Sequence, residues 1–199
     1  MPQHRDVDAF DQRAGRYDQG WLGRLHHDIA ERTAILARGP VPHRILDVGC
    51  GPGYLLRRLA TEFPQAEQFA GLDAAPAMIQ TATAAAPPGD TRFTFTVGTA
   101  ERLPYPDRSF DLVVSTTSFD HWSDQPTGLR ECFRVLAPGG RLVLADLFSA
   151  LLIPTQTGSR RGKARTRARA TRLLTGAGFT QITWHPVVPL ISAATATAP

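Results

Sequence analysis

Short apolar runs alternate with longer amphipathic stretches through the middle of the chain. The runs are bounded by glycine, proline and polar residues, and they predict strands over Arg44–Val48, Gln68–Leu72, Phe93–Val97, Phe110–Ser115 and Arg141–Leu147. The stretches between them predict helices over about Tyr54–Phe63, Pro76–Ala85 and Gln125–Leu136. This alternation is typical of an α/β fold in which helices cover both faces of a mainly parallel sheet.

Further elements flank this middle part. A helix over Trp21–Ala37 precedes it, and a helix over Arg160–Ala177 follows it. After that helix, two β-runs are predicted over Phe179–Trp184 and Leu190–Thr197, separated by the stretch Pro186–Pro189.

The length of 199 residues is enough for one domain with a sizeable core and too short for two ordinary ones. We therefore predict a single domain over residues 1–199, with an N-terminal helical segment (1–40), a central core (44–148) and a C-terminal part (149–199). The run Ala137-Pro138-Gly139-Gly140 predicts a break between the helix before it and the strand after it.

Composition narrows the class of protein. Apolar residues make up 42% of the chain and charged residues 20%, which is typical of a globular domain. The sequence holds neither an apolar run long enough for a membrane helix nor the apolar stretch of a signal peptide, so we expect a cytoplasmic protein without a membrane partner. Cys50 and Cys132 stand far apart, and we expect neither a disulfide nor a metal site.

The net charge of +4 arises from one local segment. Residues 160–172 hold seven basic side chains and no acidic one, and the rest of the chain has 15 basic against 18 acidic residues. The ordinary interpretation is a solvated surface, and a contact with nucleic-acid phosphates is the alternative.

The run from Ile45 to Gly53 carries the strongest chemical signal. A predicted strand enters the loop Gly49-Cys50-Gly51-Pro52-Gly53, which precedes a predicted helix. Glycines allow a sharp turn and a close approach to a ligand, and the helix start offers free N–H groups. The nicotinamide fingerprint GxGxxG would place glycine where Tyr54 stands. Asp47 is poorly suited to a pyrophosphate and well suited to a cationic amino-acid group.

A second acidic residue ends the next predicted strand. Asp73 follows Gly71-Leu72, twenty residues beyond Gly53. A carboxylate at this position can accept hydrogen bonds from both ribose hydroxyls of a nucleoside ligand. The alternative is a simple helix N-cap, and the spacing favours the ribose.

Five segments in order resemble the class I S-adenosyl-methionine-dependent methyltransferases, in particular the small-molecule group. They are the Asp47–Gly53 loop, Asp73 with 75–78, Gly98–Tyr105, Ser109–Val113 and Arg134–Gly140. The resemblance is strong over about half of the chain. It implies a Rossmann-like, doubly wound and mostly parallel seven-stranded sheet, with helices on both faces and the last strand antiparallel. S-adenosyl-methionine is the implied cofactor.

The resemblance also implies roles for individual residues. Gly49, Cys50, Gly51 and Gly53 would lie beneath the methionine moiety, which Asp47 would orient and whose amino group Ser115 would help to hold. Asp73 would bind the ribose, and the adenine would contact Ala74, Met78, Thr99, Ala100 and Glu101. The family often has an acidic residue at the position of Thr99. A threonine hydroxyl carries no charge, so its contact with the adenine amine would be weaker than that of an acid.

Two further segments concern the cover of the cofactor and the acceptor. The N-terminal Tyr17-Asp18 resembles the family's lid, which closes over the cofactor, so Tyr17 is expected to contact it; the alternative is a surface helix. His121, after the fourth predicted strand, is the candidate general base because its ordinary pKa lies near neutrality, with Asp120 in reserve. We expect the acceptor to be a small organic molecule enclosed by Tyr17–Leu25, Phe119–Trp122 and the apolar loop Phe148–Pro154.

Two alternatives stay open at this point. One is a nucleic-acid methyltransferase that uses the basic segment 160–172, although the run Ser115–Phe119 lacks the motifs of amino-methylating and cytosine-methylating DNA enzymes. The other is a cofactor-binding protein or an oxidoreductase on the same fold. The methyl acceptor, its acceptor atom and the oligomeric state are not specified by the sequence.

Overall fold

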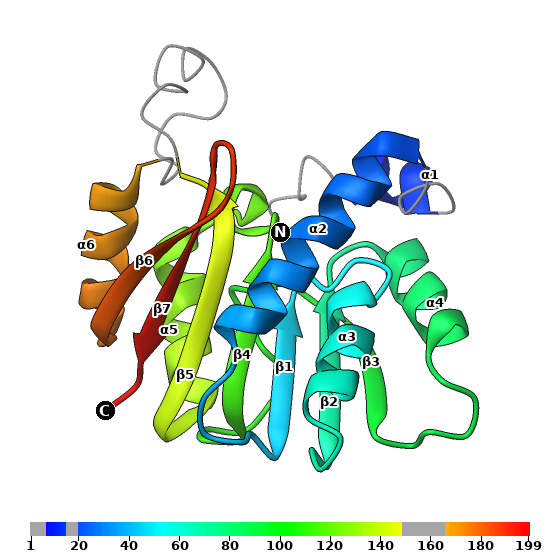
Figure 1. Ribbon diagram of the computed structural model, residues 1–199, viewed down its shortest axis with the longest axis horizontal. Coiled ribbons are helices and arrows are strands. Elements are labelled where there is room, and N and C mark those ends of the chain that lie inside the picture. The colour runs from blue at the N-terminus through cyan, green and yellow to red at the C-terminus, as the bar shows by residue number, and fades with distance from the viewer. Residues whose placement is uncertain (1–6, 15–19, 149–165) are drawn as a thin grey trace.

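The computed structural model describes residues 7–14, 20–148 and 166–199. Its centre is a seven-stranded sheet with the order β3-β2-β1-β4-β5-β7-β6 (Figure 1). The strands are β1 (Arg44–Val48), β2 (Gln68–Asp73), β3 (Phe93–Val97), β4 (Phe110–Thr116), β5 (Leu136–Leu147), β6 (Thr180–Val188) and β7 (Ile191–Thr197).

The direction of the strands agrees with the predicted fold. The first five strands pair in parallel, and β7 pairs antiparallel with both β5 and β6. The strand order reverses between β1 and β4, where open α/β sheets bind their ligands beyond the carboxyl ends of the strands.

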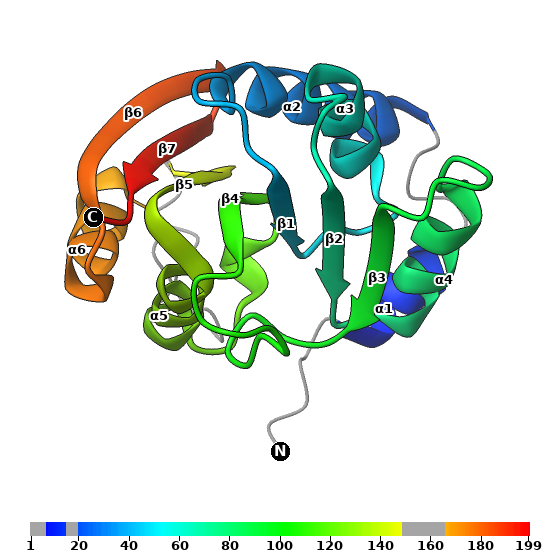
Figure 2. The same cartoon turned by 90° about the horizontal axis from the view of Figure 1, so that it is seen from below.

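Helices cover both faces of the sheet. Figure 2 shows α2 (Gly20–Leu36) and α3 (Tyr54–Glu62) on one side, with α5 (Gln125–Val135) and α6 (Arg167–Ala177) on the other. The helix α4 (Pro76–Ala85) lies beside β3, and the short helix α1 (Val7–Arg13) packs against α4. Residues at the first turn explain where α4 and α5 begin. Pro76 occupies the first turn of α4, and the Asp124 carboxylate accepts the N–H of Thr127 at the start of α5.

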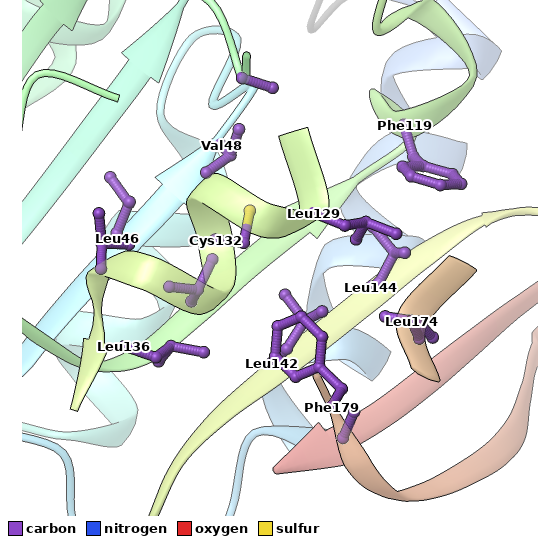
Figure 3. Packing of buried hydrophobic residues seen from close by; sticks show 14 of the residues in the cluster. Leu46, Val48, Phe119, Leu129, Cys132, Leu136, Leu142, Leu144, Leu174 and Phe179 are labelled. Atoms are coloured by element: carbon purple, nitrogen blue, oxygen red, sulfur yellow. The ribbon is translucent and has the colours of Figure 1, made fainter. Parts of the chain in front are cut away.

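The buried core has two main parts because successive strand residues point to opposite faces. Leu46 and Val48 of β1 pack in the cluster on the α5 side, where Leu129, Leu144 and Phe179 also lie (Figure 3). Ile45 packs in the second cluster, among side chains of α2 and α3. The alternation therefore turns Asp47, two residues after Ile45, toward the face that α2 and α3 cover.

The structure corrects several predicted boundaries. The strand β5 begins directly after α5, and the predicted break at residues 137–140 lies within it. Phe110 of β4 pairs with Leu136 and Leu112 pairs with Arg141, so the extra residues form a bulge. The strand β6 continues through Pro186 with a second register shift, where the sequence had predicted a break.

The N-terminal and C-terminal helices differ from the prediction as well. The prediction contained no counterpart of α1. The predicted helix over Arg160–Ala177 begins only at Arg167, because Thr166 has an extended backbone and its side chain caps the N–H of Arg169. Residues 160–165 lie outside the described residues.

Candidate functional site

A pocket lies beyond the carboxyl ends of the strands, next to the point where their order reverses. It holds about 670 Å³ of space outside the protein atoms, part of which is open solvent. We call it the main pocket. It is lined by Val7, Phe10, Val48, Gly49, Gly51, Leu72, Asp73, Ala74, Ala75, Met78, Gly98, Thr99, Ala100, Thr116, Thr117, Ser118, His121 and Trp122.

The glycine loop after β1 forms the floor of this pocket. The backbone of Gly49 has φ 77°, and a Cβ there would collide with the side chain of Ser118. The Ser118 hydroxyl donates to the carbonyl of Val48 at 3.2 Å and accepts the indole N–H of Trp122 at 2.9 Å. The segment after β4 is therefore held directly against the loop.

Asp73 connects the glycine loop to the start of α4. Its Oδ2 accepts the N–H of Gly51 at 2.9 Å, and its Oδ1 accepts the N–H of Ala75 at 2.9 Å. Burial raises the pKa of Asp73, and these backbone hydrogen bonds oppose the rise. Each carboxylate oxygen keeps a further lone pair for a ligand in the pocket that Asp73 lines.

Asp47 is buried below the same loop. Only 1% of its surface is exposed, and its Oδ1 has no hydrogen-bond partner among the described residues. Burial, and then the charge of Asp73, raise the pKa of Asp47 to about 8. A buried carboxylate without a partner is costly, and a cationic ligand placed beside it would remove that cost.

His121 lines the main pocket from the segment that follows β4. It ends the 3₁₀ turn η2 (Phe119–His121), and its ring meets the ring of Phe10 edge to face at 5.0 Å. The turn is fixed from below, because Oδ2 of the buried Asp146 accepts the N–H of Asp120 at 3.0 Å. Burial raises the pKa of Asp146, and the hydrogen bonds from the backbone N–H groups of Leu147 and Asp120 oppose that rise.

A second cavity adjoins the main pocket along the glycine loop. It holds about 400 Å³ of empty space, and we call it the side pocket. Gly49, Gly51, Thr116 and Thr117 line both. The remaining lining residues are His26, His27 and Ala30 of α2, Cys50 and Pro52 of the loop, and Tyr54 and Leu55 of α3.

The comparisons with known proteins agree with this geometry. Residues 46–144 match the family model of the methyltransferase domain. The chain is 39% identical over 129 residues to a demethylmenaquinone methyltransferase of Deinococcus radiodurans, covering 65% of this chain and 50% of that protein. It is 34% identical over 176 residues to a 27-O-demethylrifamycin SV methyltransferase of Amycolatopsis mediterranei, covering 80% and 63%.

The chain belongs to the class I S-adenosyl-methionine-dependent methyltransferases. Its fold is also that of the solved [4+2]-cyclase SpnF, with a TM-score of 0.74 and 22% identity over 98% of this chain and 96% of that one. The chain spans about half the length of the first curated relatives that it matches. The predicted family, fold and cofactor are thus confirmed.

The residues around the glycine loop fit S-adenosyl-methionine. Its sulfonium and ammonium groups are cationic, and the partnerless oxygen of Asp47 lies buried below the loop where a cation would be stabilised. Gly49 and Gly51 line the main pocket with backbone alone, so a ligand can approach the loop closely there. Asp73 would hold the ribose, and Met78, Thr99 and Ala100 line the part of the main pocket that would receive the adenine.

The structure brings most of the predicted binding residues together. Gly49, Gly51, Asp73, Ala74, Met78, Thr99, Ala100 and His121 line the main pocket, and Cys50 lines the side pocket. Ser115 is fully buried, and its hydroxyl has no hydrogen-bond partner among the described residues. Tyr17 lies outside the described residues.

Gly53 and Glu101 do not line either pocket, and neither do the buried Asp47 and Ser115. Gly53 has φ 75°, and a Cβ there would lie 3.2 Å from both Ala82 and Phe95, so its small size serves packing. The Glu101 carboxylate accepts the N–H of Asp124 at 3.0 Å, next to the start of α5. The adenine contact predicted for Glu101 is therefore not supported by its position.

Sequence reasoning missed residues that reach the site only through tertiary packing. Phe10 of α1 closes the main pocket, and Ser118 holds the segment after β4 on the loop. His26 and His27 line the side pocket from a helix far upstream of the glycine loop. Their only local signal is adjacency in a helix, which does not by itself indicate a site.

In the ranges 7–14, 20–148 and 166–199, no group of three or more His, Cys, Asp and Glu side chains could hold a metal ion. No helix in these ranges is long and apolar enough to cross a bilayer.

On α6, Arg167 donates to the Ser192 hydroxyl at 2.7 Å and lies over the ring of Trp184.

Replacing Asp73 with alanine is expected to weaken binding of S-adenosyl-homocysteine by about 1–3 kcal/mol, because charge-assisted hydrogen bonds to the ribose are lost. Calorimetric titration measures the change. Methylthioadenosine, which has the same ribose and no amino-acid end, should lose affinity to a similar extent. Unchanged affinity for both ligands would remove the ribose role of Asp73.

Proposed function

We propose that this chain transfers the methyl group of S-adenosyl-methionine to a small organic acceptor. The observation that carries the proposal is the buried, partnerless carboxylate oxygen of Asp47 below the glycine loop, together with Asp73 at the end of β2. A cationic nucleoside satisfies both acids, whereas the pyrophosphate of a dinucleotide would face two carboxylates. The family match and its methyltransferase relatives support the same activity.

S-adenosyl-methionine supplies a methyl group already activated on a sulfonium. The protein must then align the acceptor, exclude water and, for a hydroxyl or amine acceptor, take up a proton. Asp47 and Asp73 orient the cofactor from below. Phe10 and Trp122 contribute apolar side chains to the lining of the main pocket.

His121 is the proposed general base. Its side chain lines the main pocket, and the η2 turn that carries it is anchored to the buried Asp146. Asp120, the reserve candidate, is 7% exposed and does not line the pocket, so His121 is the better placed of the two.

The acceptor is proposed to lie at the carboxyl edge of the sheet near His121. In two of the three segments that we expected to enclose it, the first residue belongs to the core. Phe119 is fully buried, and Phe148 is 4% exposed and meets the rings of Phe119 and Trp184, so both belong to the core. His121 and Trp122 do line the pocket, and residues 149–154 lie outside the described residues.

Two of the relatives are named for different organic compounds, demethylmenaquinone and 27-O-demethylrifamycin SV. This variety supports an organic acceptor without naming one. The direct experiment incubates the purified chain with S-adenosyl-methionine and a panel of phenols, enols, carboxylic acids and amines. Formation of S-adenosyl-homocysteine that depends on one acceptor class is the expected result.

Binding of the cofactor without transfer to any acceptor would contradict the proposal and would favour a cofactor-binding protein. Transfer to RNA or DNA alone, when these are added to the panel, would contradict the small acceptor and would favour a nucleic-acid methyltransferase. The fold alone does not decide between these functions, as its similarity to a structure described as a [4+2]-cyclase illustrates.

A further inference from the structure

The side pocket has no part in the proposed function so far. It opens on the same glycine loop as the main pocket, since Gly49, Gly51, Thr116 and Thr117 line both cavities. Of the described residues that line it, only His26 and His27 have side chains that can carry a positive charge, and none has a carboxylate. It is therefore the part of the site best suited to an anionic group.

The ring of His27 is held in place by a network between α2 and α3. It stacks on the ring of Tyr54 with 3.9 Å between the centroids and 9° between the planes. The Tyr54 hydroxyl donates to Glu31 at 3.0 Å, and Glu31 also accepts from Arg58 at 2.6 Å. The stacked pair stands at the start of α3, where the helix dipole favours negative charge.

The amino-acid end of S-adenosyl-methionine carries an ammonium and a carboxylate. Asp47 faces the α2 and α3 side of the sheet, and its partnerless oxygen suits the ammonium. The carboxylate of the ligand must lie away from Asp47 and Asp73, because like charges in a buried site repel strongly. The side pocket shares the glycine loop with the main pocket. Its other lining residues include His26 and His27, whose imidazole rings can donate N–H groups, and Tyr54 at the start of α3.

We propose that His26 and His27 bind the carboxylate of the cofactor's methionine moiety in the side pocket. The inference rests on the proposed use of S-adenosyl-methionine and adds a recognition element of this chain to it. The two histidines then make the site selective for a nucleoside that carries an intact amino acid. Their contribution should be absent for ligands that lack the carboxylate.

The test uses three ligands and calorimetric titration of the full chain. S-adenosyl-homocysteine has the whole amino-acid end, its decarboxylated analogue keeps the amine alone, and methylthioadenosine lacks both groups. The variants are His26→Gln with His27→Gln, and His27→Phe, which keeps an aromatic ring to stack on Tyr54. His43→Gln is the matched control, since His43 is exposed and precedes β1 at the other end of the strand.

The double variant is expected to lose about 10- to 100-fold in affinity for S-adenosyl-homocysteine, the size of one or two charge-assisted hydrogen bonds. His27→Phe should lose a smaller part of the same affinity. Affinities for the decarboxylated analogue and for methylthioadenosine should stay within about twofold of the parent protein, which also shows that the variants are folded.

Two outcomes would overturn the inference. One is unchanged affinity of the double variant for S-adenosyl-homocysteine. The other is an equal loss for all three ligands, which would indicate a general effect on the pocket. If the unaltered chain bound none of the three ligands, the proposed function would fail first, and the inference would fail with it.

Discussion

Replacing His121 with alanine is expected to lower turnover by about 100- to 10,000-fold, the usual effect of removing a general base. The side chain lines the main pocket from a turn that is anchored to the buried Asp146. Affinity for S-adenosyl-homocysteine should change little, because the proposed cofactor contacts lie at Asp47, Asp73 and the glycine loop. Steady-state kinetics with the acceptor found by the panel measure the first effect, and calorimetry measures the second.

The matched control is His43→Ala, which removes an exposed imidazole outside both pockets. It should leave turnover unchanged. A fully active His121→Ala protein would take His121 out of the mechanism and would leave the cofactor assignment in place.

Replacing Asp47 with asparagine is expected to weaken binding of S-adenosyl-homocysteine by about 3 kcal/mol or more, which is over 100-fold. The amide cannot compensate a buried ammonium, and Oδ1 of Asp47 has no other hydrogen-bond partner among the described residues. Methylthioadenosine lacks the ammonium and should bind both proteins alike. An equal loss for both ligands would mean that the substitution disturbs the loop and not the ion pair.

The same residue predicts how binding depends on pH. The pKa of Asp47 is raised to about 8, so its carboxyl group is largely protonated in the free protein at neutral pH. A cationic ligand needs the carboxylate, and the affinity should therefore rise as the pH rises toward 8, with release of a proton. Calorimetry in buffers of different ionisation enthalpy measures that proton, and Asp47→Asn should release fewer.

The stability of the protein without ligand should instead fall as the pH rises. The folded pKa of Asp47 lies above its unfolded value of about 3.9, so the native state holds this proton more tightly. The contribution of Asp47 to the free energy of unfolding is fully present below a pH of about 4 and is lost as the pH rises through about 8. In thermal unfolding, Asp47→Asn should flatten this decline. Asp107→Asn, at an exposed ion pair with Arg134, should not.

The fold and much of the main pocket could be predicted because their signals are local. Alternating apolar runs placed β1 to β4 within two residues, and Pro76 marked the start of α4. The glycine loop and Asp73 lie at strand ends, where a parallel sheet brings such residues to one edge. Chemistry and topology thus agree at Asp47, Gly49 and Asp73.

The remaining features depend on contacts between distant segments. The strand β5 begins early because Leu136 pairs with Phe110, which no local pattern in residues 137–140 indicates. Glu101 was assigned to the adenine by sequence position, yet its carboxylate accepts an N–H next to the start of α5. The short helix α1 becomes part of the site because it packs on α4, where Asp11 accepts the N–H of Ala77 at 2.9 Å and Val7 and Phe10 meet the cluster around Met78.

The most direct test of the account is a calorimetric comparison of S-adenosyl-homocysteine with NAD on the unaltered chain. We predict a dissociation constant in the micromolar range for S-adenosyl-homocysteine, on the order of −8 kcal/mol, and no detectable heat for NAD. The Gly51→Val variant, altered in the loop that lines both pockets, should bind neither ligand. Tighter binding of NAD, or S-adenosyl-homocysteine binding that survives Gly51→Val, would contradict a site built around Asp47, Asp73 and the glycine loop.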